Sequence, residues 1–157
     1  MRTLRVVLFF LIVPGTIIFY LPLFLGSQAF PNPSANPFIQ YLGIGSWLIG
    51  GLVATWCVAA FFTLGKGTPD PNNPPQVLVT SGLYRWSRNP MYLGGLLIVL
   101  GHWLYFQSWV MLAYLVLVFL LFHSVVIFYE EPYMRRQFGE AHERYCEQVP
   151  RWIGWLG

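Results

Sequence analysis

The residues best suited to chemistry form two groups that lie far apart in the sequence. The first is the stretch 76–94, which holds two arginines, two tyrosines and a proline suited to starting a helix. The second is the acidic pair Glu130-Glu131, which directly follows a long apolar run. Adjacent carboxylates at the mouth of a membrane helix are costly unless a polar or cationic group meets them. Either Arg85 or Arg88 supplies that group, or a carboxylate accepts hydrogen bonds from a ligand's ammonium or hydroxyl groups.

Neighbouring helical residues point about 100° apart, so we expect the two glutamates to have different roles. Tyr84 and Tyr92 can stack on a flat ligand or donate a hydroxyl, although each taken alone is typical of an interfacial aromatic residue. Gly94-Gly95 permits close approach of a ligand or of another helix backbone.

The three histidines show no spacing typical of metal ligands, and we predict no metal site. His123 lies about 9 Å inside an apolar run, where it could line a substrate cavity, but a hydrogen-bonded packing role is favoured. His142 is predicted to be solvated on the polar side of a helix. The chain has no GxSxG, Walker, dinucleotide-binding or CxxC motif.

The composition is that of an integral membrane protein. Hydrophobic residues make up 56% of the 157-residue chain and charged residues 10%, against about 25% charged in a soluble domain. The length suits one domain, 1–157. Cys57 and Cys146 lie in unlike surroundings and are both expected to be reduced. Basic residues beside apolar runs favour lipid headgroups, and we expect no nucleic-acid partner.

We predict an all-α fold with four transmembrane helices, at about 4–25, 39–64, 91–106 and 109–129. The first is expected to be a retained span rather than a cleaved signal peptide. Small residues at four-residue steps in the second, Ser46, Gly50 and Ala54, favour close helix packing. Gln107-Ser108 offers a tight turn, so helices three and four should form a hairpin.

After Tyr129 the sequence becomes charged, and apolar residues recur at helical spacing at Met134, Phe138, Ala141, Tyr145 and Val149. This pattern predicts one amphipathic helix outside the bilayer, ended by Pro150 and followed by interfacial anchors at Trp152 and Trp155. Arginine and lysine occur only at one set of helix ends, so the positive-inside rule places both termini and the stretch 76–94 in the cytoplasm. The hairpin then brings residues 89–92 next to Glu130-Glu131.

At these residues the chain resembles the membrane methyltransferase superfamily, which includes isoprenylcysteine carboxyl methyltransferases and phospholipid N-methyltransferases. The resemblance covers about 66–152 and rests on the segments VTSGLY, RNPMYLG, EE, FGE and YCEQVP, which occur in the superfamily's order around a helical hairpin. Carboxyl methyltransferases of this type usually have histidine where this chain has Asn89. The sequence NPMY followed by EEP is similar instead to phosphatidylethanolamine N-methyltransferases. The arginine that precedes the glutamates in the carboxyl methyltransferases has no equivalent in 124–129.

The resemblance implies S-adenosylmethionine in a region spanning 76–152, capped by the C-terminal segment, with a lipid or isoprenoid-like acceptor entering from the bilayer. It implies methylation of either a carboxylate or an amine. Glu131 and His123 are the catalytic candidates, because an amine must lose a proton before it attacks. The cofactor contacts carried over by position are Gln76, Val77, Leu78, Val79, Tyr84, Asn89, Pro90, Met91, Tyr92, Glu130 and Glu131.

Two other classes of function compete with this one. A sterol-type membrane reductase has a similar C-terminal hairpin and would use NADPH, but such chains normally carry more spans. A small transporter or membrane adaptor needs no cofactor, but a four-span transporter is expected to carry a carboxylate in mid-membrane, and the predicted spans contain none. The sequence predicts neither the identity of the acceptor nor the oligomeric state.

Overall fold

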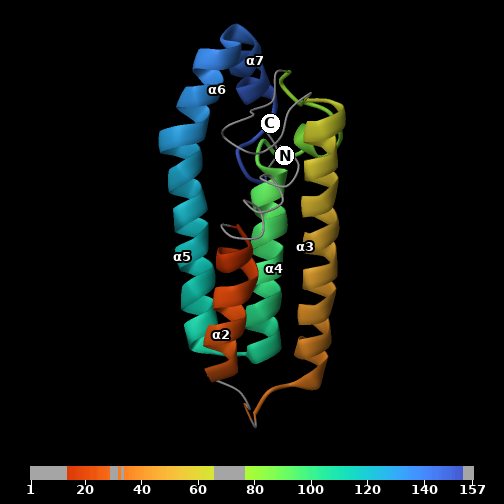
Figure 1. Cartoon of the computed structure of the whole chain (residues 1–157), viewed down its shortest axis with the longest axis vertical. Helices are drawn as coiled ribbons and strands as arrows, with labels where there is room; N and C mark the ends of the chain where they lie inside the picture. Colours follow the sequence, from red (N-terminus) through yellow and green to blue (C-terminus); the bar gives the residue numbers. More distant parts are fainter. Residues whose placement is uncertain (1–13, 29–31, 33, 66–76, 154–157) are drawn as a thin grey trace, which may run out of the picture. The chain divides into compact units, whose positions relative to one another are not determined.

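The computed structural model describes residues 14–28, 32, 34–65 and 77–153, and every regular element within these residues is a helix. This confirms the predicted all-α class for the described part of the chain. The elements run in the order η1 (Thr16–Tyr20), α2 (Leu21–Gln28), α3 (Pro37–Thr63), η2 (Gly82–Arg85), α4 (Pro90–Phe106), α5 (Trp109–Val125), η3 (Val126–Glu130), α6 (Glu131–Phe138) and α7 (Glu140–Gln148) (Figure 1).

Two helical runs are long and apolar enough to cross a membrane. They are Pro37–Thr63, with 27 residues, and Trp109–Phe138, a run of 30 residues that continues through α5, η3 and α6. Thr16–Gln28 and Pro90–Phe106 are shorter apolar helices. The predicted spans at 39–64, 91–106 and 109–129 therefore all fall on helices, whereas 4–13 lie outside the described residues. Four crossings and a cytoplasmic orientation stay predictions.

The helix ends follow from local sequence. Pro90 begins α4, where the proline's missing N–H would have had no partner in the helix. Gln107 takes a positive φ of 48° after α4 ends, and the Ser108 hydroxyl accepts a hydrogen bond from the N–H of Val110 at 3.3 Å as α5 begins. The predicted two-residue turn between the third and fourth apolar helices is thus present.

The chain divides into two compact units, one formed by 1–52 with 94–120 and the other by 53–93 with 121–157. Within the first unit, α3 and α4 approach closely at small residues. The Ser46 hydroxyl donates to the Leu97 carbonyl at 2.6 Å, and a Cβ at Gly50 would lie 2.6 Å from the Gly94 carbonyl oxygen. The small-residue pattern predicted to allow close packing does so at Ser46 and Gly50.

Replacing Gly50 by alanine should therefore destabilise the protein, whereas the same change at Gly51 should not. The new methyl group at position 50 would meet a backbone carbonyl that cannot move away cheaply, at a cost of about 1–3 kcal/mol. A Cβ at Gly51 meets nothing within 4 Å, so Gly51→Ala should be neutral or stabilising by about 0.5–1 kcal/mol through the unfolded chain. Thermal unfolding in detergent compares the two variants, and equal midpoints would contradict close packing at Gly50.

The second unit corrects two predictions about the C-terminal region. The expected single amphipathic helix is instead two, because Gly139 lies between α6 and α7 with φ 50° and ψ −129°, a conformation outside the helical region. His142 on α7 is only 5% exposed rather than solvated. The break turns α7 so that its His142 and Tyr145 are buried.

Candidate functional site

The second unit collects the side chains that can do chemistry, from the stretch 77–93, from η3 and α6, and from the C-terminal segment 149–153. The local fold of the stretch begins at Gly82, whose φ of 62° starts η2 and whose missing side chain makes room for the Trp56 ring. The Ser87 hydroxyl accepts a hydrogen bond from the backbone N–H of Asn89 at 3.1 Å. This turn directs the chain into α4.

Glu130 ends the π-helical turn η3 and pairs with a tyrosine of α4. The Tyr92 hydroxyl donates a short hydrogen bond to Glu130 Oε1, and the Phe122 ring lies against Tyr92 with a centroid separation of 4.8 Å. The structure gives the second oxygen of Glu130 no partner among the described residues. π-helical turns are rare and occur frequently at functional sites.

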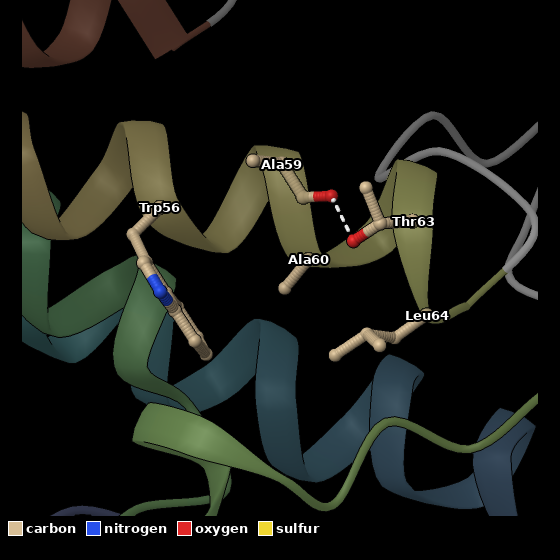
Figure 2. Close-up of a pocket in the computed structure, with 5 residues that line it drawn as sticks. All are labelled: Trp56, Ala59, Ala60, Thr63 and Leu64. Carbon is tan, nitrogen blue, oxygen red and sulfur yellow. Dashed lines mark hydrogen bonds between the residues drawn. The ribbon is translucent and has the colours of Figure 1, made fainter.

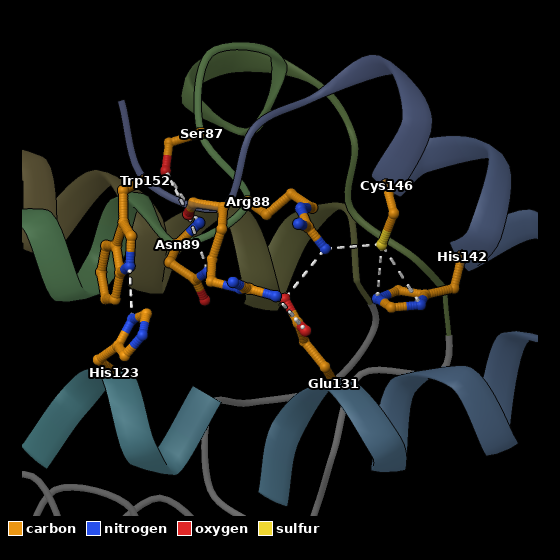
Figure 3. A network of polar contacts seen from close by, with 9 residues as sticks. Ser87, Arg88, Asn89, His123, Glu131, His142, Cys146 and Trp152 are labelled. Carbon is orange, nitrogen blue, oxygen red and sulfur yellow. Dashed lines mark hydrogen bonds and ion pairs between the residues drawn. The ribbon is translucent and has the colours of Figure 1, made fainter. Parts of the chain in front are cut away.

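Glu131 has different partners, and they are cationic. Arg151 donates two parallel hydrogen bonds to the Glu131 carboxylate, from Nε to Oε1 at 2.7 Å and from Nη2 to Oε2 at 2.9 Å. Arg88 adds a third from Nη1 to Oε1 at 3.1 Å, as Figure 3 shows for Arg88 and Glu131. The prediction that the glutamates are unlike holds for their contacts, and Arg88, not the exposed Arg85, is the neutralising arginine that the sequence offered.

Arg88 also contacts α7. Its Nη1 lies 2.7 Å from the sulfur of Cys146, and the ring nitrogens of His142 lie 3.6 and 3.7 Å from the same sulfur. Burial raises the pKa of the Cys146 thiol, although the Arg88 charge opposes this, and burial together with Arg88 lowers the pKa of His142. Both groups are therefore neutral near pH 7. Cys57 and Cys146 are both free thiols, as predicted.

The C-terminal segment, residues 149–153, is tied to the stretch by its backbone. The Pro150 carbonyl accepts from the N–H of Arg88 at 2.9 Å. The Arg151 carbonyl accepts from the Ser87 hydroxyl at 3.2 Å and from the Asn89 side-chain amide at 3.0 Å. The segment therefore holds residues 87–89 through main-chain groups and Glu131 through the Arg151 side chain.

Trp152 packs on α5. Its indole N–H donates to His123 Nδ1 at 3.1 Å, and the two rings are stacked with centroids 6.1 Å apart (Figure 3). The geometry agrees with the favoured packing role of His123, and an accepting Nδ1 places the proton of the neutral ring on Nε2. Trp155, the second predicted anchor, lies outside the described residues.

The remaining predicted cofactor contacts are unevenly accessible. Val77 is 46% exposed, whereas Val79 and Tyr84 are 6% and 5% exposed in a cluster with Cys57 and Ala60. The Tyr145 hydroxyl donates to the Tyr84 carbonyl at 2.6 Å. Leu78 is half-buried, Met91 packs against the cluster, and Gln76 lies outside the described residues. Their role as cofactor contacts stays a prediction.

A shallow apolar pocket of about 230 Å³ lies on α3 and contains none of the predicted contacts. It is lined by Trp56, Ala59, Ala60, Thr63 and Leu64. Figure 2 shows the Thr63 hydroxyl turned back to the Ala59 carbonyl, to which it donates at 2.8 Å. With that hydroxyl satisfied, the pocket offers an apolar surface and no group for catalysis.

Arg151 is the site residue that sequence reasoning missed. It follows Pro150, where the helical spacing has ended, so no periodicity places its side chain. One signal is present, since Arg151 is a lone charge within the uncharged stretch Val149-Pro150-Arg151-Trp152-Ile153. A lone arginine in such surroundings usually has a carboxylate partner.

The comparisons with known proteins identify the family of the chain. A model of the phospholipid methyltransferase family matches residues 38–141, which is more than half of the chain. The match confirms the predicted membrane methyltransferase superfamily. The chain belongs to the phospholipid methyltransferase family, and together with its two long apolar helices this makes it a membrane protein.

A curated relative is Protein-S-isoprenylcysteine O-methyltransferase of Schizosaccharomyces pombe, which is 35% identical over 81 residues. The matched region is 52% of this chain and 34% of that protein, so this chain spans about a third of the relative. No solved structure matches the chain.

Proposed function

We propose that the protein transfers a methyl group from S-adenosylmethionine to a lipid or isoprenoid-like acceptor that enters from the bilayer. The observation that carries the proposal is Glu130, a carboxylate held by Tyr92 at one oxygen and unpaired at the other among the described residues. Family membership and the O-methyltransferase relative support the reaction class. The acceptor is either an amine headgroup or a carboxylate.

The described residues fit this cofactor chemically. S-adenosylmethionine supplies an electrophilic methyl group on a sulfonium and carries an ammonium group, which a carboxylate with a free acceptor can bind. Glu130 has that acceptor, whereas the two oxygens of Glu131 already receive three hydrogen bonds from arginines. Residues 76–79, Tyr84 and 89–92 remain the other proposed contacts, with Val77 offering exposed apolar surface.

The protein would contribute mainly by aligning the two reactants and excluding water, because displacement at a sulfonium needs little proton transfer. Tyr92 and Phe122 fix the Glu130 side chain, and the C-terminal segment fixes residues 87–89. An amine acceptor would also have to be deprotonated. Glu131 and His123 were the candidates for that task, but both are engaged by other side chains. We assign them positioning roles and assign ligand contact to Glu130.

The proposed setting is a single membrane domain with four spans, both termini in the cytoplasm and the site at the cytoplasmic surface. The distribution of arginine and lysine supports this orientation, because these residues occur before the first apolar run, between the second and third, and after the fourth. A charged cofactor would then enter from water and the acceptor laterally from lipid.

Equilibrium binding of S-adenosylhomocysteine to the detergent-solubilised protein tests the proposal, with NADPH measured in parallel. We expect saturable binding of S-adenosylhomocysteine in the micromolar range, which corresponds to about −8 kcal/mol, and none of NADPH. Binding of NADPH alone would favour a reductase. Binding of neither ligand would favour a transporter or adaptor and would overturn the proposal.

A further inference from the structure

The Arg88 guanidinium donates fewer hydrogen bonds than its N–H groups could make. A guanidinium has five N–H donors, and the edge formed by Nε and Nη2 binds carboxylates or phosphates through two parallel bonds. Arg151 uses this edge on Glu131. Arg88 contacts Glu131 and Cys146 through Nη1 alone, so its own Nε–Nη2 edge has no partner among the described residues.

One atom of that edge is also enclosed. Arg88 Nε is buried without a hydrogen-bond partner, while the side chain as a whole keeps 14% of its surface exposed. A desolvated donor on a charged group is unfavourable unless an acceptor meets it. The unpaired Nε is therefore suited to binding an acceptor group of a ligand.

The local charge points to an anionic acceptor. Two guanidiniums, of Arg88 and Arg151, share the single carboxylate of Glu131, which leaves one positive charge over. Cys146 does not supply the missing negative charge, because burial raises the pKa of its thiol and keeps it neutral near pH 7. His142 adds no further positive charge, because burial lowers the pKa of its ring. Two other carboxylates of this unit have different partners, since Glu143 pairs with Arg135 at 3.5 Å and Glu130 accepts the Tyr92 hydroxyl rather than either guanidinium.

The start of α4 adds to this preference. Arg88 lies two residues before Pro90, the first residue of the 17-residue helix α4. The first N–H groups of a helix have no partner within it, and the helix dipole makes this end favourable for negative charge. The arginine edge and the helix end thus favour the same class of ligand.

We propose that Arg88 binds an oxyanion of one of the reactants, either a carboxylate or a phosphate, through its free Nε–Nη2 edge. The inference rests on the proposed function for the identity of the ligand, since two sources carry this chemistry there. One is the carboxylate of the cofactor's amino-acid part, and the other is the phosphate of a lipid headgroup. In either case Arg88 selects for a reactant that bears an anionic group beside its reacting end.

The test uses Arg88→Lys, which keeps a cation beside Glu131 but lacks the two-donor edge, with Arg88→Gln as a second variant. Arg85→Gln is the matched control, because it removes a positive charge from an exposed position in the same stretch. The readout is the thermal unfolding midpoint of the full chain in detergent. The probes form three pairs, and in each pair only the first member carries the oxyanion in question. The pairs are inorganic phosphate and chloride at equal ionic strength, S-adenosylhomocysteine and its decarboxylated analogue, and dihexanoylphosphatidylethanolamine and dihexanoylglycerol.

We expect phosphate to raise the midpoint of the wild-type and Arg85→Gln proteins but not of Arg88→Lys. If the cofactor supplies the anion, Arg88→Lys should weaken S-adenosylhomocysteine about tenfold or more and leave its decarboxylated analogue unchanged, which is the effect of losing hydrogen bonds to a charged group. If the lipid supplies the anion, Arg88→Lys should weaken the effect of dihexanoylphosphatidylethanolamine alone and leave that of S-adenosylhomocysteine unchanged.

Equal effects of every probe on wild-type and Arg88→Lys protein would overturn the inference, as would equal losses for ligands with and without the anionic group. Failure of the proposed function looks different. In that case the wild-type protein does not respond to S-adenosylhomocysteine, and the phosphate response still decides whether Arg88 binds an oxyanion.

Discussion

Replacing Glu131 by glutamine is expected to lower the free energy of unfolding by about 2–4 kcal/mol. The carboxylate is the only described partner of the Arg151 guanidinium and one of two for that of Arg88, and the three side chains are 14–33% exposed. Removing one member of a shielded ion pair leaves uncompensated charge, which costs more than the pair contributes. The glutamine amide would also point an N–H group toward a guanidinium.

The measurement is unfolding by denaturant in detergent, together with hydrogen exchange in the C-terminal peptide, which should exchange faster once Arg151 is released. Glu143→Gln is the matched control, since it breaks an ion pair whose side chains are 53% and 70% exposed. Surface pairs of this kind are worth about 0–1 kcal/mol. Equal losses in the two variants would show that Glu131 does not hold the segment through its shielded charges.

Much of the helical layout could be predicted because it depends on local sequence. Uncharged apolar runs, Pro90 and the Gln107-Ser108 turn define α3, α4 and α5 within a few residues. A two-residue turn between two helices brings the start of one near the end of the other. The closeness of Tyr92 and Glu130 could therefore also be predicted. The family resemblance rested on the same segments.

What could not be predicted depends on contacts between distant segments. The positive φ of Gly139 splits the amphipathic run, and glycine in an otherwise helical pattern does not reveal whether the helix continues. His142 shares the spacing of polar residues, yet it is only 5% exposed and lies within reach of the Arg88 charge from a distant segment. Arg151 has no periodicity, and its pairing with Glu131 exists only because Pro150 and Arg151 bind residues 87–89 through their carbonyls.

The unequal surroundings of the glutamates lead to the prediction with the largest expected effect on binding. Glu130→Gln should weaken S-adenosylhomocysteine about 10- to 100-fold, because a hydrogen bond between charged groups contributes about 1.5–3 kcal/mol. The fold should change little, since a glutamine oxygen can still accept the Tyr92 hydroxyl. Calorimetric titration of the solubilised protein gives the affinity, and its thermal unfolding midpoint gives the stability.

Tyr92→Phe separates the charge of Glu130 from its positioning. This variant keeps the carboxylate but removes the hydroxyl that orients it, so its affinity should fall less than that of Glu130→Gln. Glu131→Gln should differ from Glu130→Gln, because the Glu131 carboxylate is bound by Arg88 and Arg151. Its main effect should be a large loss of stability, and any loss of S-adenosylhomocysteine affinity should follow from that. If Glu130→Gln instead lowers the unfolding midpoint and leaves S-adenosylhomocysteine binding unchanged, then Glu130 only supports Tyr92. The ligand's ammonium group would in that case have to bind elsewhere.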